Sequence, residues 1–224
     1  MIVAIDGPSG AGKGTVARAV ARALGYRYID TGAMYRAVAW LAIERGLSLT
    51  DEARVADLTE RADFVVEAHK VEIDGHDVTR VIRTPRIDEA AAAVARLPTV
   101  RTALVTRQRL YGSSGHLVME GRDIGTTVFP HADVKLYLDA SPEERARRRA
   151  SDPAHAGEGG DVRQVATALG ARDTADRTRT ASPLQKAEDA VLIDTTKMTV
   201  DAVVREVLSL VDPTCKMENA GRSG

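Results

Sequence analysis

The sequence predicts an α/β fold with a central parallel sheet, and three observations lead to this prediction. The chain opens with residues 2–5, which are apolar throughout, as expected for a parallel strand that is buried on both faces. A glycine-rich turn, an amphipathic helix, a second strand and a second helix follow in that order, which is the alternation typical of α/β proteins. Three more apolar runs, residues 117–119, 134–138 and 191–193, bring the predicted sheet to five strands.

The helices of this core are predicted from their ends and from their apolar spacing. The first helix begins near Gly14 and ends at Gly25, and the second strand follows at residues 26–29. The second helix ends at Gly46. The last helix has the clearest apolar stripe of the chain, which consists of Val200, Val203, Val204, Val207, Leu208 and Val211.

The middle of the chain has a different pattern, and it predicts a lobe inserted into the core. Residues 64–78 alternate between apolar and polar side chains around two polar turns, which favours a small antiparallel meander. An alanine-rich helix over residues 88–96 and a helix from Pro98 to about residue 111 are expected next. The predicted division is a core of residues 1–49 and 113–212, an inserted lobe of residues 50–112, and a disordered tail of residues 213–224.

Composition and charge exclude several classes of function. Lys and Arg total 31 and Asp and Glu total 32 among 224 residues, so the net charge is −1. A general nucleic-acid binder needs a clear basic excess. The single cysteine, Cys215, permits neither an internal disulfide nor a zinc cluster. The first residues have no charged segment followed by a long apolar one, and no apolar run reaches the ~18 residues that a membrane helix needs. We therefore expect a protein without a signal peptide that is cytoplasmic.

The turn after the first strand has the composition of a phosphate-binding loop. Its residues are Gly7, Pro8, Ser9, Gly10, Ala11, Gly12, Lys13, Gly14 and Thr15. Glycines let backbone N–H groups approach phosphate oxygens, and the helix N-terminus that follows favours an anion. Lys13 adds a positive charge for the outer phosphates. We therefore predict a three-layer P-loop fold in which this loop binds the phosphates of a nucleotide and Lys13 is catalytic.

One position of the loop departs from the general P-loop pattern. That pattern places Ser or Thr directly after the lysine, where the hydroxyl holds Mg²⁺, whereas here Gly14 comes first and Thr15 follows. The form Gly-Lys-Gly-Thr resembles that of the nucleoside monophosphate kinases, adenylate kinase among them. We assign no protein ligand to the metal and expect phosphate and water oxygens to supply most of the Mg²⁺ shell.

Arginine and aspartate are concentrated in three further segments, residues 30–36, 120–126 and 172–179. The first two follow the second strand and the strand that contains Val118. Ligands of open α/β sheets bind beyond the carboxyl ends of the strands. We therefore expect these segments to lie beside the phosphate-binding loop.

The three segments, DTGAMYR, EGRDIGTTVFP and RDTADRTR, resemble those of the bacterial cytidylate kinases. The resemblance covers about residues 2–211, including an inserted lobe of the expected size. It implies an enzyme of pyrimidine metabolism that transfers the γ-phosphoryl group of ATP to CMP or dCMP, with Mg²⁺ as cofactor. It also implies that the glycine-rich loop binds ATP and that a mobile lid, about residues 147–180, closes over it.

The resemblance further implies roles for the matching residues. Those implied to bind the acceptor nucleotide are Thr31, Tyr35, Arg36, Arg101, Arg122, Asp123, Asp176 and Arg179. Among them, Thr31 and Arg36 would meet the phosphate, Arg101 and Asp123 the cytosine, and Asp176 the ribose hydroxyls. Those implied to act in catalysis beside Lys13, by clamping phosphates, are Arg122, Arg172 and Arg179.

The chemistry of cytosine supports the role of Asp123 independently. A carboxylate accepts a hydrogen bond from the N4 amino group of cytosine, whereas it repels the carbonyl that uracil carries at this position. Ala92, however, stands where the family commonly has a serine that contacts the base. We therefore expect a looser preference for CMP over UMP than is usual.

A basic run lies on the helix that starts at Pro142, and it consists of Arg145, Arg147, Arg148 and Arg149. Successive helical side chains turn by about 100°, so the four cannot share one target. Arg145 and Arg149 share a face of the helix, and we expect one or two of the run to reach the triphosphate. A glycine-rich stretch at residues 152–162 is expected to be a mobile loop.

Two alternatives stay open on the sequence alone. Another small-metabolite kinase of this fold, of the UMP or shikimate type, would share the phosphate loop, but a hydroxyl acceptor would need a nearby base. A non-kinase switch that only binds or hydrolyses ATP would not need the arginines at positions 36, 122, 172 and 179. No nucleic-acid or membrane partner is expected, and a monomer is expected because no apolar surface stripe is left over.

Overall fold

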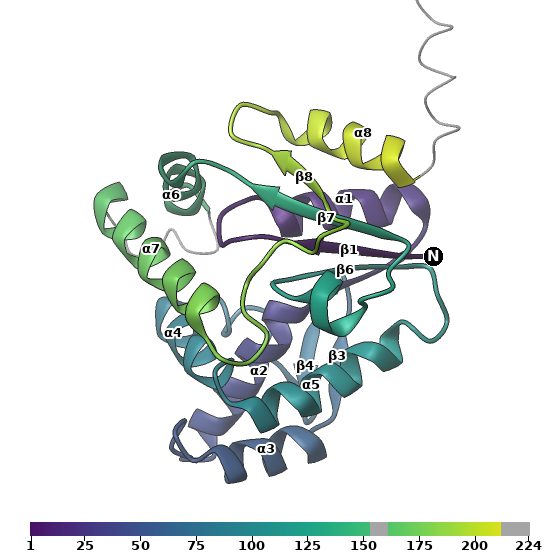
Figure 1. The fold of residues 1–224 in the computed structure, drawn as a ribbon. Helices are drawn as coiled ribbons and strands as arrows, with labels where there is room; N and C mark the ends of the chain where they lie inside the picture. Colours follow the sequence, from purple (N-terminus) through teal and green to yellow (C-terminus); the bar gives the residue numbers. More distant parts are fainter. Residues whose placement is uncertain (153–160, 212–224) are drawn as a thin grey trace, which may run out of the picture.

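The computed structural model describes residues 1–152 and 161–211, and its centre is a five-stranded parallel sheet (Figure 1). The strands are β1 (Ile2–Asp6), β2 (Arg27–Asp30), β6 (Leu117–Gly121), β7 (Val134–Asp139) and β8 (Val191–Asp194). Their order across the sheet is β2-β6-β1-β7-β8, and all neighbouring pairs are parallel. The predicted α/β fold with five parallel strands is confirmed.

Two helices, α1 (Lys13–Leu24) and α8 (Val200–Val211), cover one face of the sheet (Figure 1). Their apolar sides and the sheet form one buried cluster, to which Val20, Val118 and Val207 belong. α1 ends at Gly25 as predicted, because Gly25 adopts a φ of 66°, which glycine reaches without steric strain. Burial of this apolar surface is the main stabilisation of the layer.

Two further helices, α2 (Thr31–Glu44) and α5 (Pro98–Tyr111), cover the other face. α2 begins where β2 ends, and Asp30 caps it by accepting a hydrogen bond from the N–H of Ala33 at 2.9 Å. Met34 of α2, Leu104 of α5 and Met119 of β6 lie in one buried cluster. The three layers therefore consist of the sheet and one pair of helices on each side.

Between α2 and β6 the chain forms a group of helices and short antiparallel strands. Its elements before α5 are α3 (Glu52–Arg61), β3 (Phe64–Val66), β4 (Val71–Ile73), β5 (His76–Asp77) and α4 (Pro85–Val94). The meander predicted over residues 64–78 and the helix from Pro98 are confirmed. α4 begins earlier than predicted because Thr84 caps it, accepting a hydrogen bond from the N–H of Ile87. α3 is absent from the sequence prediction, although Asp51 caps it in the same way.

Two helices that pack against each other, α6 (Pro142–Ala150) and α7 (Val162–Thr178), come between β7 and β8 in the chain. α7 is not recognisable from apolar periodicity. Its buried residues are Leu169, Asp173 and Asp176, so two of the three are charged. Polar contacts, not an apolar stripe, therefore hold this helix against the rest of the molecule.

The loop predicted to be mobile falls for most of its length on residues 153–160. These residues, and the tail of residues 213–224 with Cys215, lie outside the part of the chain that the structure describes. Within residues 1–152 and 161–211, none of the helices has the length and apolar character needed to cross a membrane.

Candidate active site

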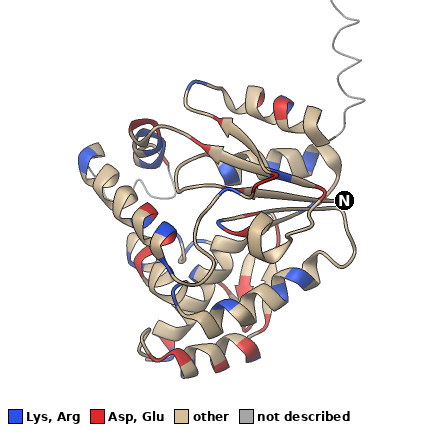
Figure 2. Cartoon of the chain, in the orientation of Figure 1, with Lys and Arg blue, Asp and Glu red and all other residues tan. Residues whose placement is uncertain are grey.

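The carboxyl ends of β1, β2 and β6 open onto one cavity of about 1070 Å³. Its walls come from the glycine-rich loop, from α2, α4, α5, α6 and α7, and from the segment that follows β6. α7, which forms one of these walls, carries residues of both charge signs (Figure 2). The volume lies slightly above the roughly 300–1,000 Å³ range of ligand pockets, which suits a large ligand or two ligands.

The glycine-rich loop follows β1, and its backbone path depends on glycine. Gly7 has a φ of 146°, and a Cβ at this position would lie 2.0 Å from the carbonyl oxygen of Leu138. Gly12, with a φ of 89°, precedes the first turn of α1. Residues 9–15 line the cavity, whereas Gly7 and Pro8 do not. Of these two residues of the predicted set, Gly7 shapes the path of the loop, and Pro8 provides the carbonyl oxygen that Lys13 contacts.

Lys13 lies in the first turn of α1 and is buried. Its Nζ donates a hydrogen bond to the carbonyl oxygen of Pro8 at 2.7 Å. Burial, and next the guanidinium of Arg122, lower the pKa of Lys13 to about 7. Because an adjacent anion favours the charged form, a bound phosphate would reverse this shift.

Glu120, at the end of β6, fills the space beside Gly14. A Cβ on Gly14 would lie 2.7 Å from Oε1 of Glu120. This oxygen also accepts a hydrogen bond from the hydroxyl of Tyr28 at 2.9 Å, and burial raises the pKa of Glu120. A carboxylate thus occupies the room that a hydroxyl-bearing side chain at position 14 would require.

Asp6 joins the end of β1 to the segment after β6. Its two carboxylate oxygens accept hydrogen bonds from the N–H groups of Ile124 (2.8 Å) and Gly125 (2.7 Å). These residues open η1 (Ile124–Val128), a single π-helical turn. Burial raises the pKa of Asp6 to about 6. The contact fixes the position of the neighbouring Asp123 relative to the glycine-rich loop.

Thr31 and Arg36, the residues expected at the acceptor phosphate, both line the cavity. The hydroxyl of Thr31 donates to the carbonyl oxygen of Glu120 at 2.8 Å. Arg36 and Arg83 donate to the same oxygen of Asp30, at 3.1 and 3.2 Å. Burial alone would raise the pKa of Asp30, but the two guanidinium groups outweigh it and the pKa is lowered.

Arg101 and Asp123, the residues expected to read cytosine, form a buried ion pair. Nη2 of Arg101 donates to Oδ2 of Asp123 at 2.5 Å. The Arg101 guanidinium lies 5.4 Å from the ring centre of Tyr35, which is within cation–π range. All three residues line the cavity, and so does Ala92, whose side chain has no hydrogen-bonding group.

Arginine and aspartate of α7 and of the segment after it are paired with the end of β6. Nε of Arg122 donates to Oδ2 of Asp176 at 3.0 Å. Nη1 of Arg179 lies 3.6 Å from Asp176, and its Nη2 lies 3.9 Å from Asp123. Arg172 also lines the cavity, and burial together with Arg122 lowers its pKa. The three Arg- and Asp-rich segments predicted to meet are therefore brought together.

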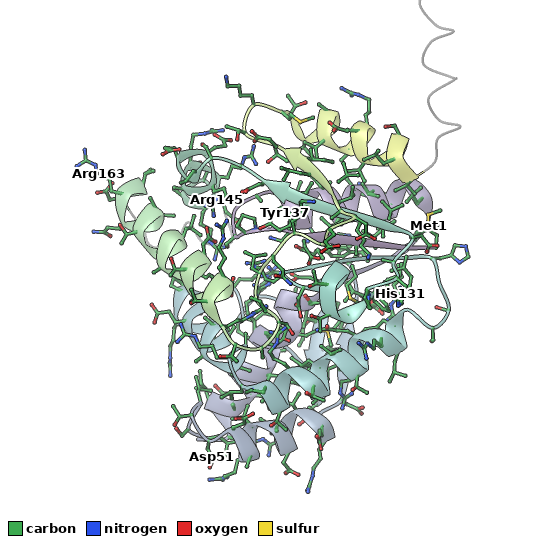
Figure 3. All side chains as sticks on the ribbon, viewed as in Figure 1. Met1, Asp51, His131, Tyr137, Arg145 and Arg163 are labelled. Atoms are coloured by element: carbon green, nitrogen blue, oxygen red, sulfur yellow. The ribbon has the colours of Figure 1, made fainter. Side chains whose placement is uncertain are left out.

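The four arginines of the basic run have different surroundings. Arg145 lies between α6 and α7 (Figure 3), where its Nη1 donates to Asp173 at 2.5 Å and to the carbonyl oxygen of Ser9 at 3.1 Å. It does not line the cavity and instead joins α6, α7 and the glycine-rich loop. Arg148 lines the cavity and donates to the hydroxyl and the carbonyl oxygen of Thr195, at 2.9 and 2.7 Å. Arg147 and Arg149 line it as well.

Arg83 and Thr195 line the cavity although the sequence analysis does not single them out. Arg83 precedes the cap of α4 in a stretch without aspartate, and Thr195 follows β8 as an ordinary polar residue. Their proximity to the site is set by the fold, so local composition carries no indication of it. Within residues 1–152 and 161–211, no group of three or more His, Cys, Asp or Glu side chains is arranged to hold a metal ion.

A parallel sheet with a glycine-rich loop before α1, and a cavity in which arginines face that loop, define a P-loop kinase. The family model for cytidylate kinase matches residues 3–213 of the chain. The cytidylate kinase of Desulfitobacterium hafniense (strain Y51) is 46% identical over 211 residues, which cover 93% of this chain and 91% of that protein. The cytidylate kinase of Pelotomaculum thermopropionicum is 48% identical over 215 residues, with coverages of 93% and 95%. The chain belongs to the cytidylate kinase family.

Two solved structures share the fold at low sequence identity. An uncharacterised protein from Eubacterium ventriosum ATCC 27560 matches with a TM-score of 0.54 at 12% identity, covering 95% of this chain and 98% of that chain. A gluconokinase from Sinorhizobium meliloti 1021 matches with a TM-score of 0.50 at 14% identity, with coverages of 97% and 96%. These likenesses concern the arrangement of the elements alone.

The lowered pKa of Lys13 predicts that ATP binding takes up a proton. At pH 8 the free side chain, with a pKa of about 7, is mostly neutral, whereas beside a triphosphate it is charged. Titration calorimetry in two buffers of different ionisation enthalpy should therefore show uptake of about one proton for each ATP bound. The uptake should be absent in Lys13→Met. Equal apparent enthalpies in both buffers for the wild type would contradict the assignment.

Proposed function

We propose that this protein phosphorylates CMP and dCMP, using ATP as the phosphoryl donor. One observation carries the proposal: the glycine-rich loop and the Arg101–Asp123 pair line the same cavity. Membership of the cytidylate kinase family supports it. The two reacting phosphates would meet between the loop, Arg36 of α2, Arg172 of α7, and the arginines that directly follow β6 and α7, Arg122 and Arg179.

ATP binds with its phosphates against residues 9–15 of the loop. The backbone N–H groups at the start of α1 face the phosphates, and Lys13 carries its positive charge when they are present. Arg148, held by Thr195 above Gly12, is 3.7 Å from where a Cβ of Gly12 would be. This places one arginine of the basic run next to the phosphate loop, and it supports a contact with ATP.

The acceptor nucleotide occupies the opposite wall. Arg36 and Arg172 bind its phosphate, Asp176 binds its ribose hydroxyls, and Thr31 borders the same region. Arg122 and Arg179 each pair with Asp176, where the end of β6 meets α7. We assign these two arginines to the phosphates of both nucleotides. With Arg172, they neutralise the charge that develops as the phosphoryl group moves.

The reaction needs positioning and charge neutralisation more than proton transfer. An oxygen of the CMP phosphate, already ionised at neutral pH, bonds to the γ-phosphorus of ATP while the bond from that phosphorus to the β–γ bridging oxygen breaks. CDP and ADP result, and no general base is required. An arginine that stabilises such a transition state contributes ~10³ to 10⁵ in rate.

The base site supports cytosine as the preferred base. Oδ2 of Asp123 accepts a hydrogen bond from Arg101 at 2.5 Å, which fixes the position of the carboxylate. Its Oδ1 then accepts a hydrogen bond from the N4 amino group of the base. Ala92 adds no further polar contact, so selectivity against UMP depends mainly on the Arg101–Asp123 pair.

Mg²⁺ is the metal that suits this site. The loop has Gly14 in place of a hydroxyl residue, and Glu120 is the carboxylate beside it, so the ion would be held largely by phosphate and water oxygens, with Glu120 at its border. When bound, Mg²⁺ neutralises charge on the phosphates of ATP. Lys13 and the arginines bind and orient the same phosphates from the protein side.

We assign residues 1–49 and 113–212 to the kinase core, residues 50–112 to the acceptor lobe, and residues 147–180 to a lid that closes over ATP. The ion pairs Asp176–Arg122 and Arg179–Asp123 support the lid assignment, since they join α7 and the residue after it to the phosphate and base sites. A cytoplasmic monomer is the form in which the enzyme acts.

A coupled assay with ATP and CMP, dCMP, UMP, AMP, GMP or shikimate tests the function directly. We expect the highest kcat/KM with CMP or dCMP, lower values with UMP, and none with shikimate, which offers neither a phosphate to the arginines nor a base to the Arg101–Asp123 pair. Lys13→Ala should reduce turnover to background while the melting curve stays cooperative. Failure to phosphorylate any pyrimidine monophosphate would exclude the proposal.

Replacement of Asp123 tests the source of base selectivity. Asp123→Asn offers an amide N–H₂ that can donate to the O4 carbonyl of uracil, so the ratio of kcat/KM for CMP to that for UMP should fall by roughly 10-fold or more. Overall activity should fall as well, since Arg101 loses its charged partner; the ratio is therefore the informative quantity. Asp201→Asn, at an exposed aspartate of α8, should leave both values unchanged. An unaltered ratio in Asp123→Asn would show that another group selects the base.

A further inference from the structure

Asp88 is a buried carboxylate of α4 that has no part in the mechanism described above. Its side chain is 11% exposed. It lies one helical turn before Ala92, and residues four apart share a helix face, so it is on the side of α4 that faces the cavity region. Among the described residues, Arg36 of α2, Arg149 of α6 and Arg172 of α7 lie beside it, each on a different element.

The geometry places Asp88 behind these arginines. Oδ1 of Asp88 lies 3.7 Å from Nη1 of Arg36 and 3.6 Å from Nη1 of Arg172, and Oδ2 accepts a hydrogen bond from Nη2 of Arg149. All three arginines line the cavity, whereas Asp88 does not. An acceptor phosphate can therefore reach the guanidinium groups without displacing the carboxylate, and the arginines lie between two anions when the site is filled.

The arginines need a nearby negative charge, because several of them are crowded together. Burial lowers the pKa of Arg149, Asp88 opposes this, and the charges of Arg36 and Arg83 lower the pKa further. For Arg172, burial and the charge of Arg122 lower the pKa, and the charge of Asp88 opposes this shift. Without Asp88, mutual repulsion would drive Arg149 and Arg172 apart from Arg36, and α6 and α7 would lose these ion pairs to α4.

We propose that Asp88 is a positioning residue for phosphoryl transfer, which holds Arg36, Arg149 and Arg172 in one arrangement and joins α4 to α6 and α7. The inference rests on the proposed function. Because Asp88 lies behind the arginines and does not line the cavity, it acts through the arginines and not on the substrate. Loss of the Asp88 carboxylate misplaces the guanidinium groups in the transition state. The same loss removes a negative charge near the site that binds the phosphate dianion of CMP. The rate should therefore suffer while the affinity for CMP does not.

Steady-state kinetics of Asp88→Asn at saturating ATP test this proposal. We expect kcat to fall about 10- to 100-fold, the size of effect that a misplaced catalytic group produces, while KM for CMP stays constant or decreases. Asp88→Glu, which keeps the charge, should recover part of the lost kcat. The matched control is Glu89→Gln, which removes the same charge from an exposed neighbour on α4 and should behave as wild type.

Several results would overturn the inference. These are a kcat of Asp88→Asn within about twofold of wild type, an increase in KM for CMP at unchanged kcat, or an equal loss in Glu89→Gln. Should Asp88→Asn not fold, Arg149→Gln removes the hydrogen-bonded partner instead; it should show the same loss of kcat, and a wild-type kcat there would overturn the inference. A wild-type protein that does not phosphorylate CMP would contradict the proposed function itself.

Discussion

The site depends on one constraint, namely that many guanidinium groups must be held in a buried cavity before any substrate neutralises them. An isolated buried charge is strongly destabilising unless it is paired and hydrogen-bonded. Each arginine expected to bind substrate therefore has a carboxylate partner, and the pairs are Arg36 with Asp30 and Asp88, Arg101 with Asp123, Arg122 and Arg179 with Asp176, and Arg172 with Asp88. The net charge of −1 gives no indication of this local concentration of arginines.

The same pairs and their neighbours give the site its rigidity. Arg145 joins the glycine-rich loop to Asp173 of α7, and Asp6 joins the end of β1 to the turn that carries Asp123. Charges that are fixed before the substrate arrives need no reorganisation during the reaction, and such preorganisation is a large part of enzymatic rate enhancement. The polar network thus explains how α7 is retained without an apolar stripe, and in the proposed function it also positions the phosphates.

How much of this the sequence predicts depends on whether a feature is local. The strand, glycine-rich loop and helix that begin the chain are contiguous, so residues 2–24 predict their own structure, and the five parallel strands follow from apolar runs. α7 was missed because its contacts are polar and distant, as with Asp176 and Arg122. The positions of Arg83 and Asp88 beside the cavity, and the low pKa of Lys13, result from packing between separate elements, which composition and spacing do not encode.

The central claim is that one cavity binds both nucleotides with their phosphates in contact. The most direct measurement is calorimetric binding of a compound in which cytidine and adenosine are joined 5′ to 5′ by a chain of phosphates. If the claim is correct, it binds with one-to-one stoichiometry, at least ~100-fold more tightly than CMP alone because the second half binds intramolecularly, and it prevents binding of both CMP and ATP. An affinity equal to that of CMP alone, with ATP still able to bind, would contradict the account.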